Sequence, residues 1–256
     1  MHFLIGATTI TTPPVYIDLA AVFLGGLSGA LFAEQRRVPI TGVLALAMVT
    51  GLGGGIIRDV LLNVTPIALT NPVYLPLVVI AAVIGFYFTS LVKRVQLLIT
   101  ILDPIWMALY AVIGAEKSLD YGLNAWAAIL IGVVTGIGGG VLRDILAGEK
   151  PEIMLGGPIN QLAVIIGSAV YVGLVAGLRV NKPTSELLVI ALVFGIRMLA
   201  LKFGIRAPEP VDLPKQVPAV VRRTLKRRKR AGGNGEGSPP EDTPAGSSEQ
   251  AGGPIG

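Results

Sequence analysis

Cysteine is absent from this sequence, histidine occurs once (His2), and charged side chains make up only 14% of its 256 residues. Without cysteine, disulfides and thiolate chemistry are excluded. Because the single histidine is the second residue, imidazole metal sites and Ser-His-Asp or Cys-His catalysis are excluded as well. We therefore expect neither an enzyme nor a resident metal or cofactor.

The chain is too apolar for a water-soluble monomer, since 52% of its side chains are hydrophobic and its mean hydropathy is +0.71. The 33 glycines and 18 prolines follow no collagen-like period. Many of them lie inside apolar runs, as is common in membrane helices. Residues 1–15 lack a basic start, a long apolar core and a small-residue cleavage site, so we predict no cleaved signal peptide.

Seven apolar stretches are long enough to cross a bilayer as helices, which takes about 20 residues. They are continuous rather than alternating, which argues against the strands of a membrane barrel. The sequence therefore predicts an all-α integral membrane protein with seven transmembrane helices. The predicted spans are 16–33, 39–62, 74–92, 97–115, 123–147, 160–178 and 186–205.

The basic residues of the loops predict the orientation, because cytoplasmic loops retain positive charge. With the C-terminus in the cytoplasm, that side holds Arg36, Arg37, Lys93, Arg94 and Lys150, and the other side holds only Lys117, Arg179 and Lys182. We expect a plasma membrane protein with residues 1–15 outside and a disordered tail, 207–256, inside. The basic run 222–230 binds anionic lipid or serves only as an orientation signal.

A duplication is visible in two segments of twelve residues. TGLGGGIIRDVL (50–61) and TGIGGGVLRDIL (135–146) share eight residues at an offset of 85 positions, and the same offset pairs Asp18 with Asp103. The repeats span 16–92 and 97–178, with three predicted helices each. An odd number of helices makes the second repeat enter the membrane from the opposite side, so we predict inverted repeats followed by an unmatched helix, 186–205.

Each repeat carries a glycine triplet inside a predicted helix, where a glycine costs about 0.5–1 kcal/mol relative to alanine. One interpretation is a helix break whose free backbone groups face an ion or a small solute. The alternative is close helix packing. Because the triplets recur at matching positions beside charges, we favour the break. The residues are Gly53, Gly54, Gly55, Gly138, Gly139 and Gly140.

Charged residues follow both triplets: Arg58 and Asp59 in the first repeat, Arg143 and Asp144 in the second. Charges at membrane depth face a partner, the bundle interior or water. We therefore predict the pairs Asp18–Arg58 and Asp103–Arg143. We expect Asp59 and Asp144 either to line a pathway or to cap backbone groups; the alternative is that all these charges are purely structural.

One further intramembrane charge, Arg197, lies near the middle of the last predicted helix. It needs an acidic or carbonyl partner that the sequence does not identify.

The doubled GGG-x-x-RD motif resembles the prokaryotic trimeric intracellular cation channel family, whose sequence domain is also labelled a glycine transporter domain. The similarity covers about residues 15–205 and includes GGGIIRD (53–59), GGGVLRD (138–144), Asp103-Pro104 and FGIRMLAL (194–201). It implies a homotrimer in which each protomer has its own pore along kinked helices 39–62 and 123–147. Potassium and other monovalent cations would pass the triplets and the Arg-Asp pairs.

Two transport functions remain open at this stage. One is a potassium-permeable channel, and the other is a carrier for glycine or another small amino acid that binds at broken helix ends. The expected partners are the solute, the lipid bilayer and further copies of the chain. GLGGGI lacks the spacing of a phosphate loop and follows a helix-length apolar run, so we expect neither nucleotide nor nucleic-acid binding.

Overall fold

The computed structural model describes residues 15–89, 95–154 and 160–203. Within these ranges the chain is helical and contains no strand. The predicted external segment and cytoplasmic tail lie outside the described residues. The elements are α1 (Val15–Gln35), α2 (Ile40–Leu61), α3 (Ile67–Thr70), α4 (Tyr74–Thr89), α5 (Val95–Asp120), α6 (Ala125–Leu146), the 3-10 turn η1 (Glu152–Met154), α7 (Asn160–Val172), the π-helical turn η2 (Gly173–Gly177) and α8 (Lys182–Phe203).

Every predicted span contains an α-helix, but three helix ends differ from the prediction by four residues or more. α7 ends at Val172 rather than at 178, and the π-helical turn η2 continues it to Gly177. α5 continues to Asp120 rather than ending at 115, because its last polar side chains have partners on other helices. α8 begins at Lys182 rather than at 186. Its start is capped by Asn181, whose Oδ1 accepts the N–H of Thr184 at 3.0 Å.

Of the helices in the described ranges, four are both long and apolar enough to cross a membrane: α1, α2, α5 and α6. Two shorter apolar stretches, Tyr74–Tyr87 and Gln161–Gly177, accompany them. The apolar helices identify a multi-pass membrane protein.

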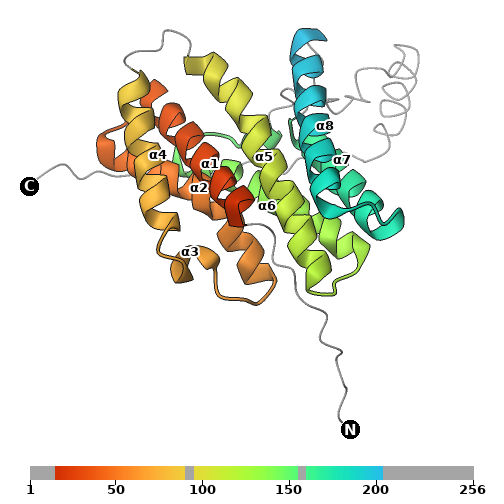
Figure 1. The fold of residues 1–256 in the computed structure, drawn as a ribbon. Coiled ribbons are helices and arrows are strands. Elements are labelled where there is room, and N and C mark those ends of the chain that lie inside the picture. Colours follow the sequence, from red (N-terminus) through yellow and green to blue (C-terminus); the bar gives the residue numbers. More distant parts are fainter. Residues whose placement is uncertain (1–14, 90–94, 155–159, 204–256) are drawn as a thin grey trace, which may run out of the picture. The chain divides into compact units, whose positions relative to one another are not determined.

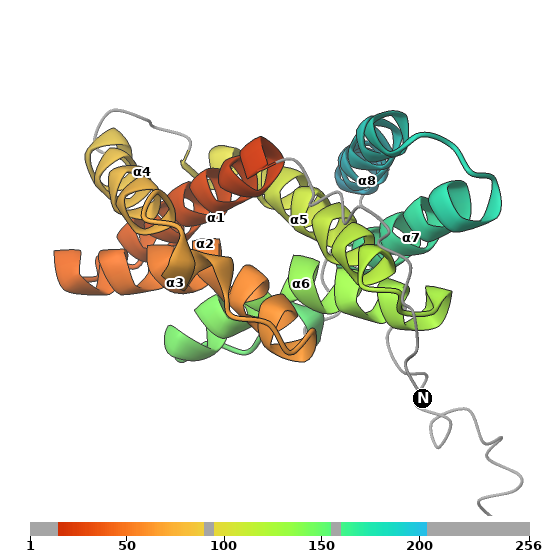
Figure 2. The ribbon, with the colours of Figure 1, turned by 60° about the horizontal axis from the view of Figure 1, so that its bottom comes forward.

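The helices form two groups of three that pack against each other. α1, α2 and α4 contact one another, as do α5, α6 and α7. The groups meet where α2 crosses α6 and where α1 packs along α5. α8 packs on α5 and α7, so that α5 lies between α1 and α8 in both views (Figure 1, Figure 2).

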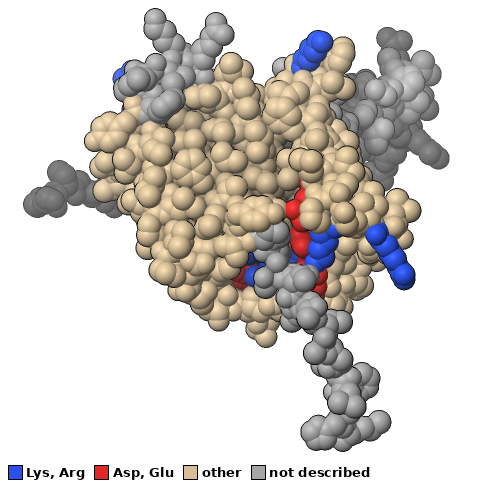
Figure 3. Space-filling view, viewed as in Figure 1, with Lys and Arg blue, Asp and Glu red and all other residues tan. Residues whose placement is uncertain are grey.

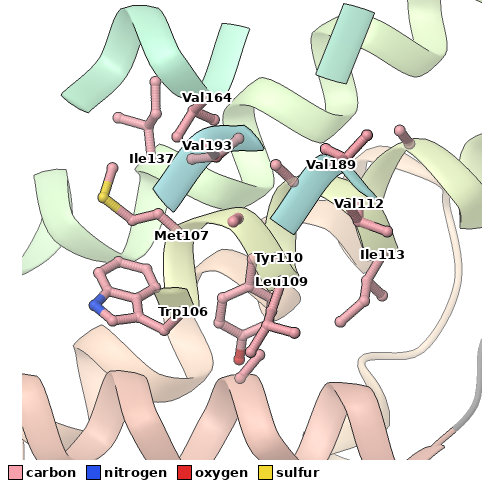
Figure 4. Close-up of a cluster of buried hydrophobic side chains, with 14 of the residues drawn as sticks. Trp106, Met107, Leu109, Tyr110, Val112, Ile113, Ile137, Val164, Val189 and Val193 are labelled. Atoms are coloured by element: carbon pink, nitrogen blue, oxygen red, sulfur yellow. The ribbon is translucent and has the colours of Figure 1, made fainter. Parts of the chain in front are cut away.

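The larger hydrophobic core surrounds α5, which contacts helices of both groups. Trp106 and Tyr110 of α5 are fully buried, and their rings meet edge to face with centroids 6.2 Å apart. Val189 and Val193 close the core from α8 (Figure 4). Because lipid tails are as apolar as these side chains, close van der Waals packing stabilises the arrangement rather than removal from water.

The turns that follow the helices also match between the two halves of the chain at an offset of 85 positions. Backbone φ is positive at Arg37 and at Gly122, which follow α1 and α5, and at Asn63 and Gly148, which follow α2 and α6. A left-handed residue at this position closes a helix by satisfying its last carbonyl groups. The two halves of the chain therefore share backbone conformation as well as sequence.

Candidate functional site

The two glycine triplets lie where α2 crosses α6. A Cβ atom on Gly54 would lie 2.3 Å from the carbonyl oxygen of Thr135, and one on Gly139 would lie 2.5 Å from that of Thr50. Both distances are far below van der Waals contact, so these glycines permit the close approach of the two backbones. The contacts are reciprocal, since Thr50 and Thr135, like Gly54 and Gly139, lie 85 positions apart.

The predicted break at the triplets is wrong, because α2 and α6 run through them as uninterrupted α-helices. The packing interpretation applies to the middle glycines. Glycine lowers helix propensity, but the surrounding helical hydrogen bonds persist and the neighbouring helix replaces the missing side chain. The third position of each triplet is less crowded: a Cβ on Gly55 or Gly140 would come no closer than 3.8 Å and 3.6 Å to Tyr110 and Trp106.

The first charged cluster consists of Asp18, Arg58, Asp59, Tyr74 and Lys117. Arg58 pairs with Asp18 (Nη1 to Oδ1, 3.2 Å) and with Asp59 (Nε to Oδ1, 2.8 Å). The Tyr74 hydroxyl donates to Oδ2 of Asp18 at 2.6 Å, and Lys117 Nζ lies 2.7 Å from Oδ1 of Asp59. Apart from Lys117, these residues are buried. Their charges balance, which offsets the cost of burying them.

The second charged cluster consists of Asp103, Arg143, Asp144, Ser28 and Trp106. Arg143 pairs with Asp103 (Nη1 to Oδ2, 3.5 Å) and with Asp144 (Nε to Oδ1, 3.1 Å). Oδ1 of Asp103 accepts hydrogen bonds from the Ser28 hydroxyl and from Nε1 of Trp106, the latter at 3.0 Å. One donor from the neighbouring helix α1 and one from α5 itself therefore orient this buried carboxylate.

Both predicted ion pairs, Asp18–Arg58 and Asp103–Arg143, are present. Of the two roles considered for the remaining aspartates, capping is observed. Oδ2 of Asp59 accepts the N–H of Ile67 at 2.9 Å, and Oδ2 of Asp144 accepts that of Glu152 at 3.0 Å. Residues 67 and 152 are themselves 85 positions apart, so each carboxylate holds the start of the equivalent short helix.

The clusters also contain partners that the sequence did not reveal, because these residues are not repeated. Lys117, which neutralises Asp59, corresponds to Phe32 in the other repeat. The Phe32 ring lies under the guanidinium group of Arg143, 4.2 Å from its Cζ. The first cluster thus has an amine where the second has an aromatic face.

Arg197, whose partner the sequence left open, lies beside Glu152. Its guanidinium group is buried, and Nη2 lies 4.0 Å from Oε1 of Glu152. Nε and Nη1 have no hydrogen-bond partner. α8 has no counterpart in the first half of the chain. Arg197 therefore adds a positive charge beside the second charged cluster, and no equivalent residue does so beside the first.

Among the described residues, a sizeable cavity borders each cluster. The smaller of these two, about 120 Å³, is bounded by Asp18, Arg58, Tyr74, Ile113 and Lys117 among others. The larger, about 210 Å³, is lined mainly by polar and charged side chains: Phe32, Gln35, Arg36, Gln96, Ile99, Thr100, Asp103, Arg143, Asp144, Glu149, Lys150, Glu152 and Arg197. Each volume is large enough for several water molecules.

Two buried aromatic rings of α5 pack beside the point where α2 and α6 cross at their glycine triplets. Tyr110 donates its hydroxyl hydrogen to the carbonyl of Gly51 on α2, and Trp106 packs against the positions of Gly139 and Gly140 on α6. The described conformation thus places aromatic side chains beside the closest approach of the two helices.

An ion pair outside the helices borders the larger cavity. Arg36, just after α1, donates two hydrogen bonds to Glu149 in the loop after α6, one of them from Nη2 to Oε2 at 2.6 Å. These hydrogen bonds lower the pKa of the Glu149 carboxyl group. The pair therefore joins the two halves of the chain at the cavity mouth.

Comparison with known proteins gives matches over most of the described helices. A family model described as "Glycine transporter" matches residues 15–90 and 100–176. A UPF0126 membrane protein of Streptomyces coelicolor is 39% identical over 207 residues, which are 80% of this chain and 94% of the relative. The UPF0126 inner membrane protein YadS of Escherichia coli K12 is 29% identical over 195 residues, 75% and 94% of the two chains.

A solved structure with the same arrangement of helices is also known. The TRIC trimeric intracellular cation channel orthologue from Rhodobacter sphaeroides superposes with a TM-score of 0.70 at 32% sequence identity. The match covers 75% of this chain and 98% of the channel.

Proposed function

Because the chain belongs to the glycine transporter (UPF0126) family and is similar in structure to a prokaryotic TRIC channel, we propose that it is a membrane cation channel permeable to potassium and other monovalent cations. This proposal is carried by the two matched charged clusters. Each cluster contains an Arg-Asp pair of α2 or α6 that follows the crossing of the two helices, and each borders a cavity. One pathway lies within each protomer.

The pathway runs along α2 and α6, past the triplets and the Arg-Asp pairs. The carboxylates of Asp59 and Asp144 supply negative charge for a passing cation, and the arginines hold them in place when the ion is absent. Opening requires the crossing of α2 and α6 to loosen and the rings of Trp106 and Tyr110 to move aside, because both now pack against it.

The architecture of the proposed channel is seven membrane-spanning helices, with α1, α2 and α4 as one inverted repeat, α5, α6 and α7 as the other, and α8 unmatched. The reciprocal contacts at the crossing and the matched turns support it. The N-terminus lies outside and the C-terminus in the cytoplasm, in accord with the positive-inside rule. The assembly is a homotrimer, because the similar Rhodobacter sphaeroides protein is a trimeric intracellular cation channel orthologue.

Flux through liposomes containing the purified protein tests this proposal. We expect potassium to flow down its gradient without saturation, and we expect no uptake of radiolabelled glycine. Leucine in place of Gly139 abolishes the flux, because the side chain collides with the Thr50 carbonyl. Leucine in place of Gly195 on α8, where a Cβ has open space around it, is the matched control and leaves the flux intact.

The same experiment distinguishes the carrier. Saturable glycine uptake with counterflow, and no potassium current in single-channel recordings, would reject the channel and assign the clusters to binding of a small amino acid. The family description "Glycine transporter" is the reason to include this measurement.

A further inference from the structure

A third set of charged side chains lies between α5, α7 and α8, outside the two charged clusters. Glu116 and Asp120 are one helical turn apart on α5, and Lys182 and Glu186 are one turn apart on α8, so the two helices present these residues to each other. Acidic and basic atoms gather next to the C-terminal end of α5 on a largely uncharged face (Figure 3). We refer to these residues as the α5–α8 acidic group.

The acidic group has more carboxylates than cationic partners. Lys182 Nζ lies 2.6 Å and 2.9 Å from the two carboxylate oxygens of Asp120 and 3.1 Å from Oε1 of Glu116. Glu186 is only 4% exposed, and its Oε1 has no hydrogen-bond partner. Because Lys182 is the one cation of the group and already pairs with both acids of α5, the group has a net negative charge if all three carboxyl groups are ionised.

Glu186 faces Glu116, which is itself 2% exposed. Two ionised carboxylates are acceptors only, so they repel each other and form no hydrogen bond between them. The other neighbour is Tyr171 of α7, a fully buried residue whose hydroxyl faces Glu116 and is the donor available to that carboxylate. Oε1 of Glu186 has no hydrogen-bond partner, and buried polar atoms in proteins are almost always paired, so Glu186 lacks a hydrogen-bond donor.

We propose that Glu116 and Glu186 bind one proton between them, so that the α5–α8 acidic group is a proton-binding site separate from the ion pathway. The protonated carboxyl group becomes the missing donor to its neighbour and removes one of the two adjacent negative charges. The ligand is a proton rather than a metal ion, because among the described residues no set of three acidic, cysteine or histidine side chains has the placement to hold a metal.

The bound proton makes the packing of α8 on α5 dependent on pH. When it is released, Glu116 and Glu186 repel each other in a buried position, with Asp120 beside them and Lys182 shared among all three. The stabilising contribution is thus present at low pH and lost as the pH rises through the release of the proton. This conclusion does not depend on which solute the protein transports.

Infrared spectroscopy of the full-length protein in lipid tests the proposal, because a protonated carboxyl group absorbs apart from an ionised one. We expect a carboxyl band at neutral pH that disappears on titration to alkaline pH. Glu186→Gln and Glu116→Gln, which imitate the protonated side chain in shape, each remove that band. Glu149→Gln is the control, since Glu149 is paired with Arg36 and ionised, and it leaves the band unchanged.

Thermal unfolding provides a second readout, which compares the pH dependence of the wild-type protein with that of a variant. Wild-type protein loses stability from mildly acidic to mildly alkaline pH, and Glu186→Gln is less sensitive over that range. A wild-type protein without the band at neutral pH overturns the proposal, as does a band that survives in both glutamine variants. A wild-type unfolding temperature that follows sodium or potassium concentration instead of pH would also overturn it and assign the site to a metal cation.

Discussion

Alanine in place of Gly54 is expected to force α2 and α6 apart at their crossing. The added Cβ would lie 2.3 Å from the carbonyl oxygen of Thr135, and rotation of a side chain does not relieve a clash with a backbone atom. The same change at Gly55 places the Cβ 3.8 Å from the ring of Tyr110, which is ordinary contact. Gly55→Ala is therefore the matched control, because the adjacent position lies in the same helix.

The magnitude follows from two opposing terms. Alanine improves helix propensity by about 1 kcal/mol over glycine at either position. Overpacking in a closely packed interior costs typically about 1–3 kcal/mol. Only Gly54→Ala carries the second term, so its free energy of unfolding should fall below that of Gly55→Ala by about 1–3 kcal/mol. Gly139→Ala should behave like Gly54→Ala, because its Cβ would lie 2.5 Å from the carbonyl of Thr50.

Equilibrium unfolding in mixed micelles, followed by circular dichroism, measures this difference for the purified variants. Potassium flux on the same samples shows whether the altered crossing also affects transport. Equal stability of Gly54→Ala and Gly55→Ala would refute the reasoning, since it would mean that the backbones of α2 and α6 do not approach closely in the membrane.

Three further predictions concern the charged groups. A double-mutant cycle of Asp103→Asn with Arg143→Gln should give a coupling of about 1–3 kcal/mol in unfolding experiments, and simple additivity would argue against the pair. Tyr74→Phe removes a buried hydroxyl that donates to a carboxylate and should destabilise by about 1–2 kcal/mol; unchanged stability would contradict that hydrogen bond. Because the pKa of Glu149 is lowered, its pairing with Arg36 stabilises above the unfolded-state pKa and is lost as pH falls through the folded one. The unfolding stability of Glu149→Gln should lack that acid dependence. A pH profile identical to that of the wild-type protein would reject this role of the Arg36–Glu149 pair.

Several features follow from the sequence alone because they depend on local or repeated patterns. Apolar runs of helix length predict the helices, and the offset of 85 positions pairs Asp18 with Asp103 and Arg58 with Arg143. Since charges at membrane depth need partners, the duplicated Asp and Arg residues were enough to predict both ion pairs. The doubled motif also identified the family.

Other features were decided only by the tertiary structure, because they depend on what lies opposite a residue. By sequence, the repeated glycine triplets favour a broken helix, but the carbonyls of Thr50 and Thr135 on the facing helices decide for a close crossing. Glu116 and Glu186 lie 70 residues apart in the sequence, and neither belongs to a repeated motif. Only the packing of α8 on α5 brings these two carboxyl groups together, and their burial makes the missing donor significant.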